Sequence, residues 1–176
     1  MLSPTSAREL ATELLGSNSR RWLHSAAAAA QAGRLREHLN PDEAEQLVAA
    51  AWLHDIGYAE SVRETGFHPL DGARFLDALG ERALARFTAY HSNSEVEAGY
   101  RGLLPELMPF EAPPQQLLDA LTFCDMTSGP TGDRVTFDER IAEILERYGR
   151  EHVVGQSIIT GELALRAAVE RFAHLV

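Results

Sequence analysis

The sequence contains no lysine, and all sixteen of its basic residues are arginine. This absence excludes lysine from every catalytic role. A single cysteine, Cys124, excludes an internal disulfide framework and is compatible with a reducing cytosol. The chain also lacks a charged-then-apolar leader and any run near the ~20 apolar residues of a membrane span. We therefore expect a cytoplasmic protein without a membrane partner.

The chain is acidic, with a net charge of −10, and this charge limits its partners. An acidic surface repels polyanions, so a nucleic acid polymer is not expected as a partner. A small anionic substrate remains compatible, because a bound metal reverses the field locally. The 176 residues, 45% of them hydrophobic, are enough for one domain with a packed core. Homo-oligomerisation stays open.

Helical signals repeat along the whole chain, and strand signals are nearly absent. Capping patterns predict helix starts at Ser6 with Glu9, at Asn40 before Pro41, and at Thr136 with Glu139. We expect helices at about 18–37, 41–54, 68–79, 81–91, 94–103 and 137–148, one opened by Pro113 and Pro114, and a last one after Thr160. The fold class predicted is all-α, with seven to nine helices in a single domain over 1–176.

Metal-ligating residue types stand at the ends of these helices. His54 and Asp55 are adjacent at a predicted helix terminus, where the backbone leaves helical geometry and neighbouring side chains can converge. Gly57 then supplies a flexible exit from the helix. His24 lies within another helix, and Asp125 lies on the apolar face of a third. Three separate helices can therefore offer ligands to one central point.

Two further histidines extend this set. His68 opens a predicted helix, and His91 closes one. Six nitrogen and oxygen ligands are too many for one tetrahedral ion and suit two metals bridged by a carboxylate, for which Asp55 is the natural candidate. With no thiolate in the set, manganese, iron, magnesium, zinc and nickel all remain open as the one or two divalent ions.

The order His24, then His54-Asp55, then Asp125 resembles the HD-domain superfamily of metal-dependent phosphohydrolases. The string His54-Asp55-Ile56-Gly57 is similar to its HDIG subset, and the resemblance covers about residues 20–127. It implies an all-helical fold in which these four positions bind a divalent metal at the centre of the bundle. His68, followed by Gly72, and His91 look like the extra ligands of the two-metal branches. The helices over 137–176 are expected to pack on this core.

The chain departs from several branches of that superfamily. Tyr58 stands where members often carry lysine, so any role of that lysine is vacant. His91 lacks the second histidine and the Gly-Tyr-Pro signature of the cyclic-di-GMP phosphodiesterases, and the Glu-Asp pair of alarmone hydrolases is missing. The segment His91-Ser92-Asn93 only loosely resembles the His-Thr-x-Gly of diadenosine-tetraphosphate hydrolases. The substrate therefore remains open.

The predicted function is hydrolysis of a phosphoester or phosphoanhydride bond, in a nucleotide or a similar small phosphorylated metabolite. Metal-activated hydroxide would attack, with Asp55, His68 and His91 at the catalytic centre. Arginine forks match phosphate oxygens, and the candidates for substrate binding are Arg20, Arg21, Arg63 and Arg134. Two alternatives remain: a di-iron oxygenase of the same superfamily, and a metal- or nucleotide-binding module without turnover.

Overall fold

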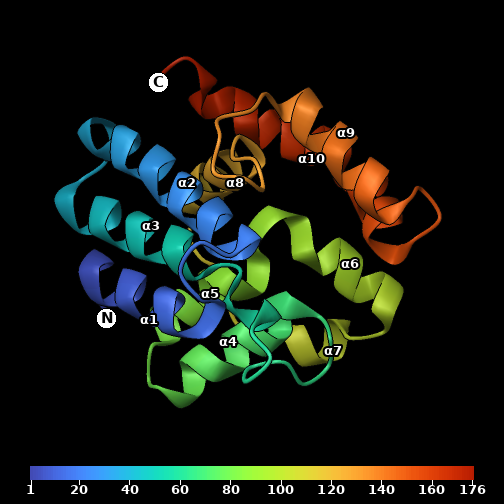
Figure 1. Ribbon diagram of the computed structural model, residues 1–176, viewed down its shortest axis with the longest axis horizontal. Coiled ribbons are helices and arrows are strands. Elements are labelled where there is room, and N and C mark those ends of the chain that lie inside the picture. Colours follow the sequence, from blue (N-terminus) through green and yellow to red (C-terminus); the bar gives the residue numbers. More distant parts are fainter.

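The computed structural model describes all residues of the chain, 1–176, as an all-α bundle (Figure 1). Nine α-helices have eight residues or more, and a tenth, α7, has four. In chain order they are α1 Pro4–Leu15, α2 Arg20–Arg34, α3 Pro41–Leu53, α4 His68–Ala78, α5 Arg82–Tyr90, α6 Ser94–Arg101, α7 Leu104–Leu107, α8 Gln115–Met126, α9 Phe137–Tyr148 and α10 Val153–Ala173. Short 3₁₀ turns, η1 Leu35–His38, η2 Ile56–Tyr58 and η3 His91–Asn93, follow α2, α3 and α5. The predicted all-α class is confirmed.

Capping side chains fix several helix ends where the sequence predicted them. The Asn40 side chain accepts a hydrogen bond from the Glu43 amide at 3.0 Å, with Pro41 in the first turn of α3. Thr136 and Glu139 form the reciprocal capping box at the start of α9. Gly149 ends α9 at a φ of 84°, which suits glycine.

Two predicted helix starts were wrong. The first helix begins at Pro4, because Ser3 and not Ser6 is its N-cap, and Ser3 accepts from the Ser6 amide. The last helix begins at Val153 with His152 as its N-cap, so Thr160 lies inside it. The buried face of α10 already starts at Gly155 and Ile158, and Gly155 lies close to the backbone of Gly149 and Arg150.

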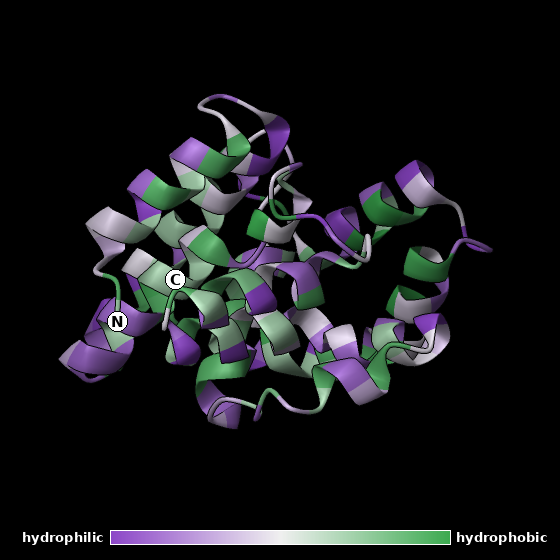
Figure 2. Ribbon diagram, turned by 90° about the horizontal axis from the view of Figure 1, so that it is seen from below, coloured by the Kyte–Doolittle hydropathy of each residue, from purple (hydrophilic) through white to green (hydrophobic).

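Helix α8 lies at the centre of the bundle and contacts α2, α3 and α10. Each of its residues from Leu117 to Met126 is buried, including Asp119 and Asp125. The facing parts of α2 and α3 are rich in buried alanine, which lets the two backbones pack closely. Figure 2 shows the hydrophobic residues concentrated between the helices, with hydrophilic ones on the outer faces. The ends of α3, α5 and α8 are therefore enclosed by other elements.

None of the helices combines the length and the apolar character that crossing a bilayer requires.

Candidate metal centre

The structure brings the six predicted ligand residues together from five helices. The side chains lie within α2, at the end of α3, at the start of α4, at the end of α5 and near the end of α8. Five of the six residues are at most 6% exposed, and His68 is half-buried. The residues are His24, His54, Asp55, His68, His91 and Asp125.

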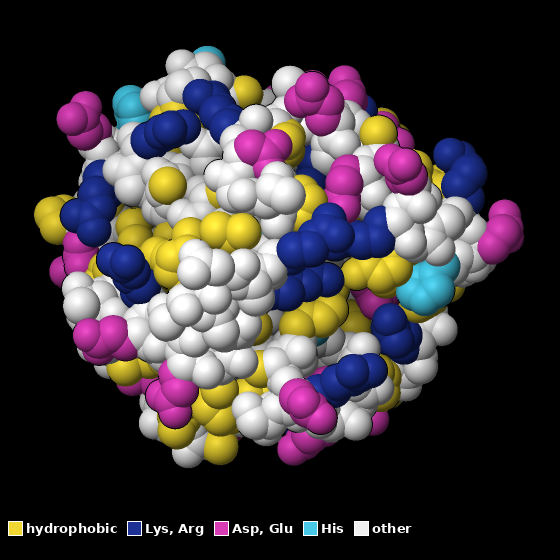
Figure 3. All heavy atoms as spheres, in the orientation of Figure 1, with side chains coloured by type: hydrophobic (Ala, Val, Ile, Leu, Met, Phe, Trp, Pro, Cys, Tyr) yellow, Lys and Arg dark blue, Asp and Glu magenta, His cyan; other side chains and the backbone are white.

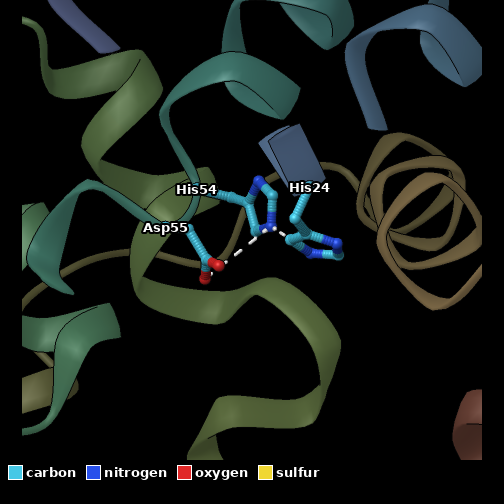
Figure 4. Close-up of side chains that lie close together, drawn as sticks. All are labelled: His24, His54 and Asp55. Carbon is cyan, nitrogen blue, oxygen red and sulfur yellow. Dashed lines mark hydrogen bonds and ion pairs between the residues drawn. The ribbon is translucent and has the colours of Figure 1, made fainter. Parts of the chain in front are cut away.

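The first group of ligand atoms joins His24, His54 and Asp55 (Figure 4). The Nε2 atoms of His24 and His54 are 3.3 Å apart, and Nε2 of His54 lies 3.8 Å from Oδ1 of Asp55. Asp125 completes this group, because its Oδ1 lies 2.9 Å from Nε2 of His24 and 3.9 Å from Nε2 of His54. Two carboxylates and two imidazoles therefore converge on one small volume.

The second group joins Asp55, His68 and His91. Nε2 of His68 lies 3.2 Å from Oδ1 of Asp55 and 3.1 Å from Nε2 of His91. Asp55 belongs to both groups, which is the position that a bridging carboxylate requires.

Backbone carbonyls set the tautomers of two of these histidines. Nδ1 of His54 donates to the Ala51 carbonyl and Nδ1 of His91 to the Thr88 carbonyl, both at 2.7 Å. A carbonyl only accepts, so these nitrogens carry the proton and each Nε2 presents a lone pair to the cluster. Lone pairs and carboxylate oxygens facing one another repel unless a cation lies between them. This donor set fits a divalent metal ion.

The electrostatics of the cluster keep its donors in the forms that bind metals. Burial alone would raise the pKa of Asp55, but the adjacent Arg21 guanidinium holds it well below its usual range. The pKa of Asp125 is also well below its usual range, because the hydrogen bond with His24 and the charge of Arg140 outweigh the effect of burial. Burial lowers the pKa of His68 to about 4 against the opposing effect of Asp55. At neutral pH the site thus holds ionised carboxylates and a neutral His68.

Gly57 is required for a close approach of two backbone segments. A Cβ atom on Gly57 would lie 2.0 Å from the carbonyl oxygen of His68 and 2.7 Å from the amide nitrogen of Gly72. From the sequence we expected Gly57 to serve as a flexible residue at the end of the helix. That explanation was wrong, because Gly57 lies in a 3₁₀ turn and its φ is not positive. The missing side chain lets α4 pack directly on η2, and this contact sets His68 beside Asp55.

A two-residue turn in left-handed conformation carries the chain away from His91. Ser92 and Asn93 have φ values of 49° and 61°, which side-chain-bearing residues adopt at a cost of ~1–3 kcal/mol each. Ser92 uses this geometry to donate from its hydroxyl to Oδ2 of Asp125. The turn therefore holds a carboxylate that belongs to the ligand cluster, a contact that sequence patterns did not indicate.

A cleft opens beside the cluster, and its walls carry basic side chains. Nη1 of Arg21 donates to Oδ2 of Asp55 at 2.9 Å and Nη2 to the Tyr148 hydroxyl at 3.1 Å. Its guanidinium lies 3.5 Å over the ring of Tyr58, which stacks on His68 with ring centres 4.0 Å apart. Tyr58 thus stands at the position where HD domains often carry lysine, and its ring lies between the Arg21 guanidinium and the His68 ring.

Of the four arginines predicted to bind substrate, only Arg21 lines this cleft. Arg20 is exposed and 4.0 Å from Glu143, Arg63 is exposed, and Arg134 donates to the carbonyl of Val176 at 3.2 Å. Their place is taken by Arg140 and Arg147 of α9, which sequence reasoning missed. Both lie in a helix with no motif of its own, and only the packing of α9 brings them to the cleft. Figure 3 shows basic side chains gathered near the middle of the face between α2 and α9.

The sequence matches the HD domain family over residues 21–126. This match covers more than half of the chain. The chain belongs to the HD-domain family. HD domains are generally metal-dependent phosphohydrolases, in agreement with a buried cluster of histidines and aspartates that is compatible with a divalent metal. No curated protein and no solved structure shows significant similarity to the chain.

Proposed function

We propose that this HD domain hydrolyses a phosphoester or phosphoanhydride bond in a nucleotide or a similar small phosphorylated metabolite. One observation carries the proposal: the His–Asp cluster lies at the base of a cleft whose walls present Arg21, Arg140 and Arg147. The planar fork of arginine matches phosphate oxygens in charge and in geometry. Three such groups in a chain of net charge −10 favour a small anionic substrate at this place.

The proposal assigns the ligands to two positions that share Asp55. His24, His54 and Asp125 would hold one divalent ion, and His68 and His91 the other. Bound there, the metal supplies Lewis acidity toward a phosphoryl oxygen and lowers the pKa of water.

The remaining chemistry belongs to the protein's own residues. Arg21 holds the Asp55 carboxylate in place through the 2.9 Å hydrogen bond and is itself held by Tyr148. From this position its guanidinium can also reach a phosphoryl oxygen in the cleft. Ser92 orients Asp125 from the other side of the cluster. Both carboxylates thus keep fixed positions while the substrate binds, which limits the reorganisation that the reaction requires.

Phosphate release from a panel of nucleotides and simple phosphate esters tests the proposal, together with elemental analysis of the metal content per chain. Asp55→Asn keeps the size of the side chain but removes its charge, and we expect it to lower the rate at least ~100-fold and to reduce metal content. Asp119→Asn is a matched control, because Asp119 is equally buried in the core and paired with an arginine, Arg171, away from the cleft.

Two outcomes would contradict the hydrolase. Oxygen consumption with a polyol or phosphonate, and no phosphate release, would favour the di-iron oxygenase. Stoichiometric nucleotide binding without product would favour the binding module. Full metal content and activity in Asp55→Asn would refute the bridging role of this carboxylate.

A further inference from the structure

The wall of the cleft opposite the metal cluster comes from α9 and the start of α10, which lie outside the matched residues 21–126. Arg140 is the residue of this wall nearest to the cluster, with Nη2 3.6 Å from Oδ1 of Asp125. Its side chain is only 6% exposed, and its buried Nε has no hydrogen-bond partner. A buried donor without a partner is costly, and an oxygen of a bound anion would satisfy it.

The Glu143 carboxylate forms ion pairs with both arginines of this wall. Its Oε2 accepts from Nη1 of Arg140 at 2.6 Å, and its Oε1 lies 3.4 Å from Nε of Arg147 and 4.0 Å from Nη2 of Arg20. Carboxylate and phosphate bind the arginine fork in the same way. Glu143 therefore neutralises a cationic subsite that an anionic ligand can use in its place.

Three other residues of this wall are apolar. Ile144, Val154 and Ile158 line the cleft beyond Arg140. Arg147 is the other basic group of this wall and is paired with Glu143, and Glu97 across the cleft is paired with Arg101. Such surroundings suit an uncharged organic group better than a second or third phosphate.

We propose that Arg140 binds the phosphoryl group of a phosphomonoester and that the apolar wall beside it contacts the organic group of that ester. The proposal rests on the phosphohydrolase function above and names its substrate class. The C-terminal helices then select the substrate, while the matched segment carries the metal ligands.

Titration calorimetry on the protein as purified tests this role without turnover, using orthophosphate as the probe. Arg140→Gln removes a charge-assisted contact, and we expect it to weaken orthophosphate binding about 10-fold or more. Arg166→Gln is the control, because Arg166 pairs with an aspartate and a glutamate, Asp138 and Glu162, as Arg140 does, but does not line the cleft. Unchanged affinity in Arg140→Gln, or an equal loss in Arg166→Gln, would overturn the assignment.

Glu143→Gln provides an independent arm that does not remove a buried arginine. If Glu143 competes with the ligand, this variant binds orthophosphate at least about twofold more tightly. A purely structural ion pair predicts equal or weaker binding, and that result would overturn the proposal.

The substrate class is tested in the same experiment with two analogues whose P–C bonds are not hydrolysed, phenylphosphonate for a monoester and methylenediphosphonate for a pyrophosphate. We expect phenylphosphonate to bind more tightly than methylenediphosphonate, with the preference reduced in Val154→Ser. Tighter binding of methylenediphosphonate would overturn the monoester assignment. Orthophosphate binding that depends on Arg140, without hydrolysis of any ester, would refute the proposed function but not this inference. Hydrolysis of an ester, with unchanged orthophosphate affinity in Arg140→Gln, would refute this inference but not the proposed function.

Discussion

Gly57→Ala is the most informative single substitution outside the ligands. The new Cβ would lie 2.0 Å from the carbonyl oxygen of His68 and 2.7 Å from the carbonyl carbon of the same residue. Both are backbone atoms at the first turn of α4, and they cannot move away by changing a rotamer. Either η2 or α4 must shift by more than about 1 Å to reach an ordinary van der Waals distance.

The cost follows from the packing of this contact. Adding a methyl group to a well-packed interior costs about 1–3 kcal/mol when side chains can adjust, and more when only backbone can move. Gly72, the other close neighbour, is tightly packed as well, because a Cβ there would lie 2.8 Å from Cγ2 of Thr88. We therefore expect a loss of about 3 kcal/mol or more in the free energy of unfolding, equivalent to a drop in Tm of ~6–12 °C.

Denaturant unfolding followed by circular dichroism measures this loss, and elemental analysis measures its effect on the metal site. Because the shift displaces His68 relative to Asp55, metal content should fall as well. Gly33→Ala is the control: Gly33 lies in α2, and a Cβ atom added there would have no neighbour within 4 Å, so alanine should stabilise by about 0.5–1 kcal/mol. A Gly57→Ala protein within about 0.5 kcal/mol of wild type would refute the close-approach reasoning.

Three other predictions concern the metal site, a cap and the core. With two ions bound as proposed, His68→Ala should reduce the metal content to one ion per chain, because His68 belongs only to the second ligand group; unchanged stoichiometry by elemental analysis would contradict this. Hydrogen bonds from the backbone and hydroxyl of Thr136 lower the pKa of Glu139 in the folded protein below its ordinary value of about 4.3. These hydrogen bonds therefore stabilise the fold fully above the ordinary pKa, and the stabilisation is lost as the pH falls through the lower pKa of the folded state. The difference in denaturation midpoint between wild type and Glu139→Ala should therefore shrink on acidification, and a constant difference would rule out this linkage. Leu121→Ala should cost about 2–5 kcal/mol at a fully buried position of α8, whereas Leu163→Ala, which is 84% exposed, should change unfolding by less than about 0.5 kcal/mol; similar losses in the two would be inconsistent with the core described.

Local signals in the sequence predicted the helices well where capping chemistry was complete. Asn40 before Pro41, and Thr136 with Glu139, satisfy backbone groups within a few residues, so their effect does not depend on the rest of the fold. The start of α10 was missed because His152 is an unusual N-cap and because the first turn is buried against Gly149 and Arg150, a contact that only the fold brings about.

The candidate ligands were recognisable because their residue types are rare at apolar helix ends and because their order resembles one superfamily. The cleft was not recognisable in this way. Arg140 reaches Asp125 only through the packing of α9, and three of the four arginines chosen from sequence position lie elsewhere. Arginines are common on exposed helix faces, so the sequence alone cannot separate a solvated one from one that is 6% exposed.

The sequence by itself determined the all-α class, most helix boundaries and the six candidate metal ligands, since helical periodicity, capping and residue chemistry act over short distances along the chain. Only the tertiary structure decided which arginines face the cluster, why Gly57 must be glycine and how Ser92 holds Asp125. These features depend on contacts between segments far apart in the chain, where a shift of about 1 Å in one backbone decides whether an atom fits.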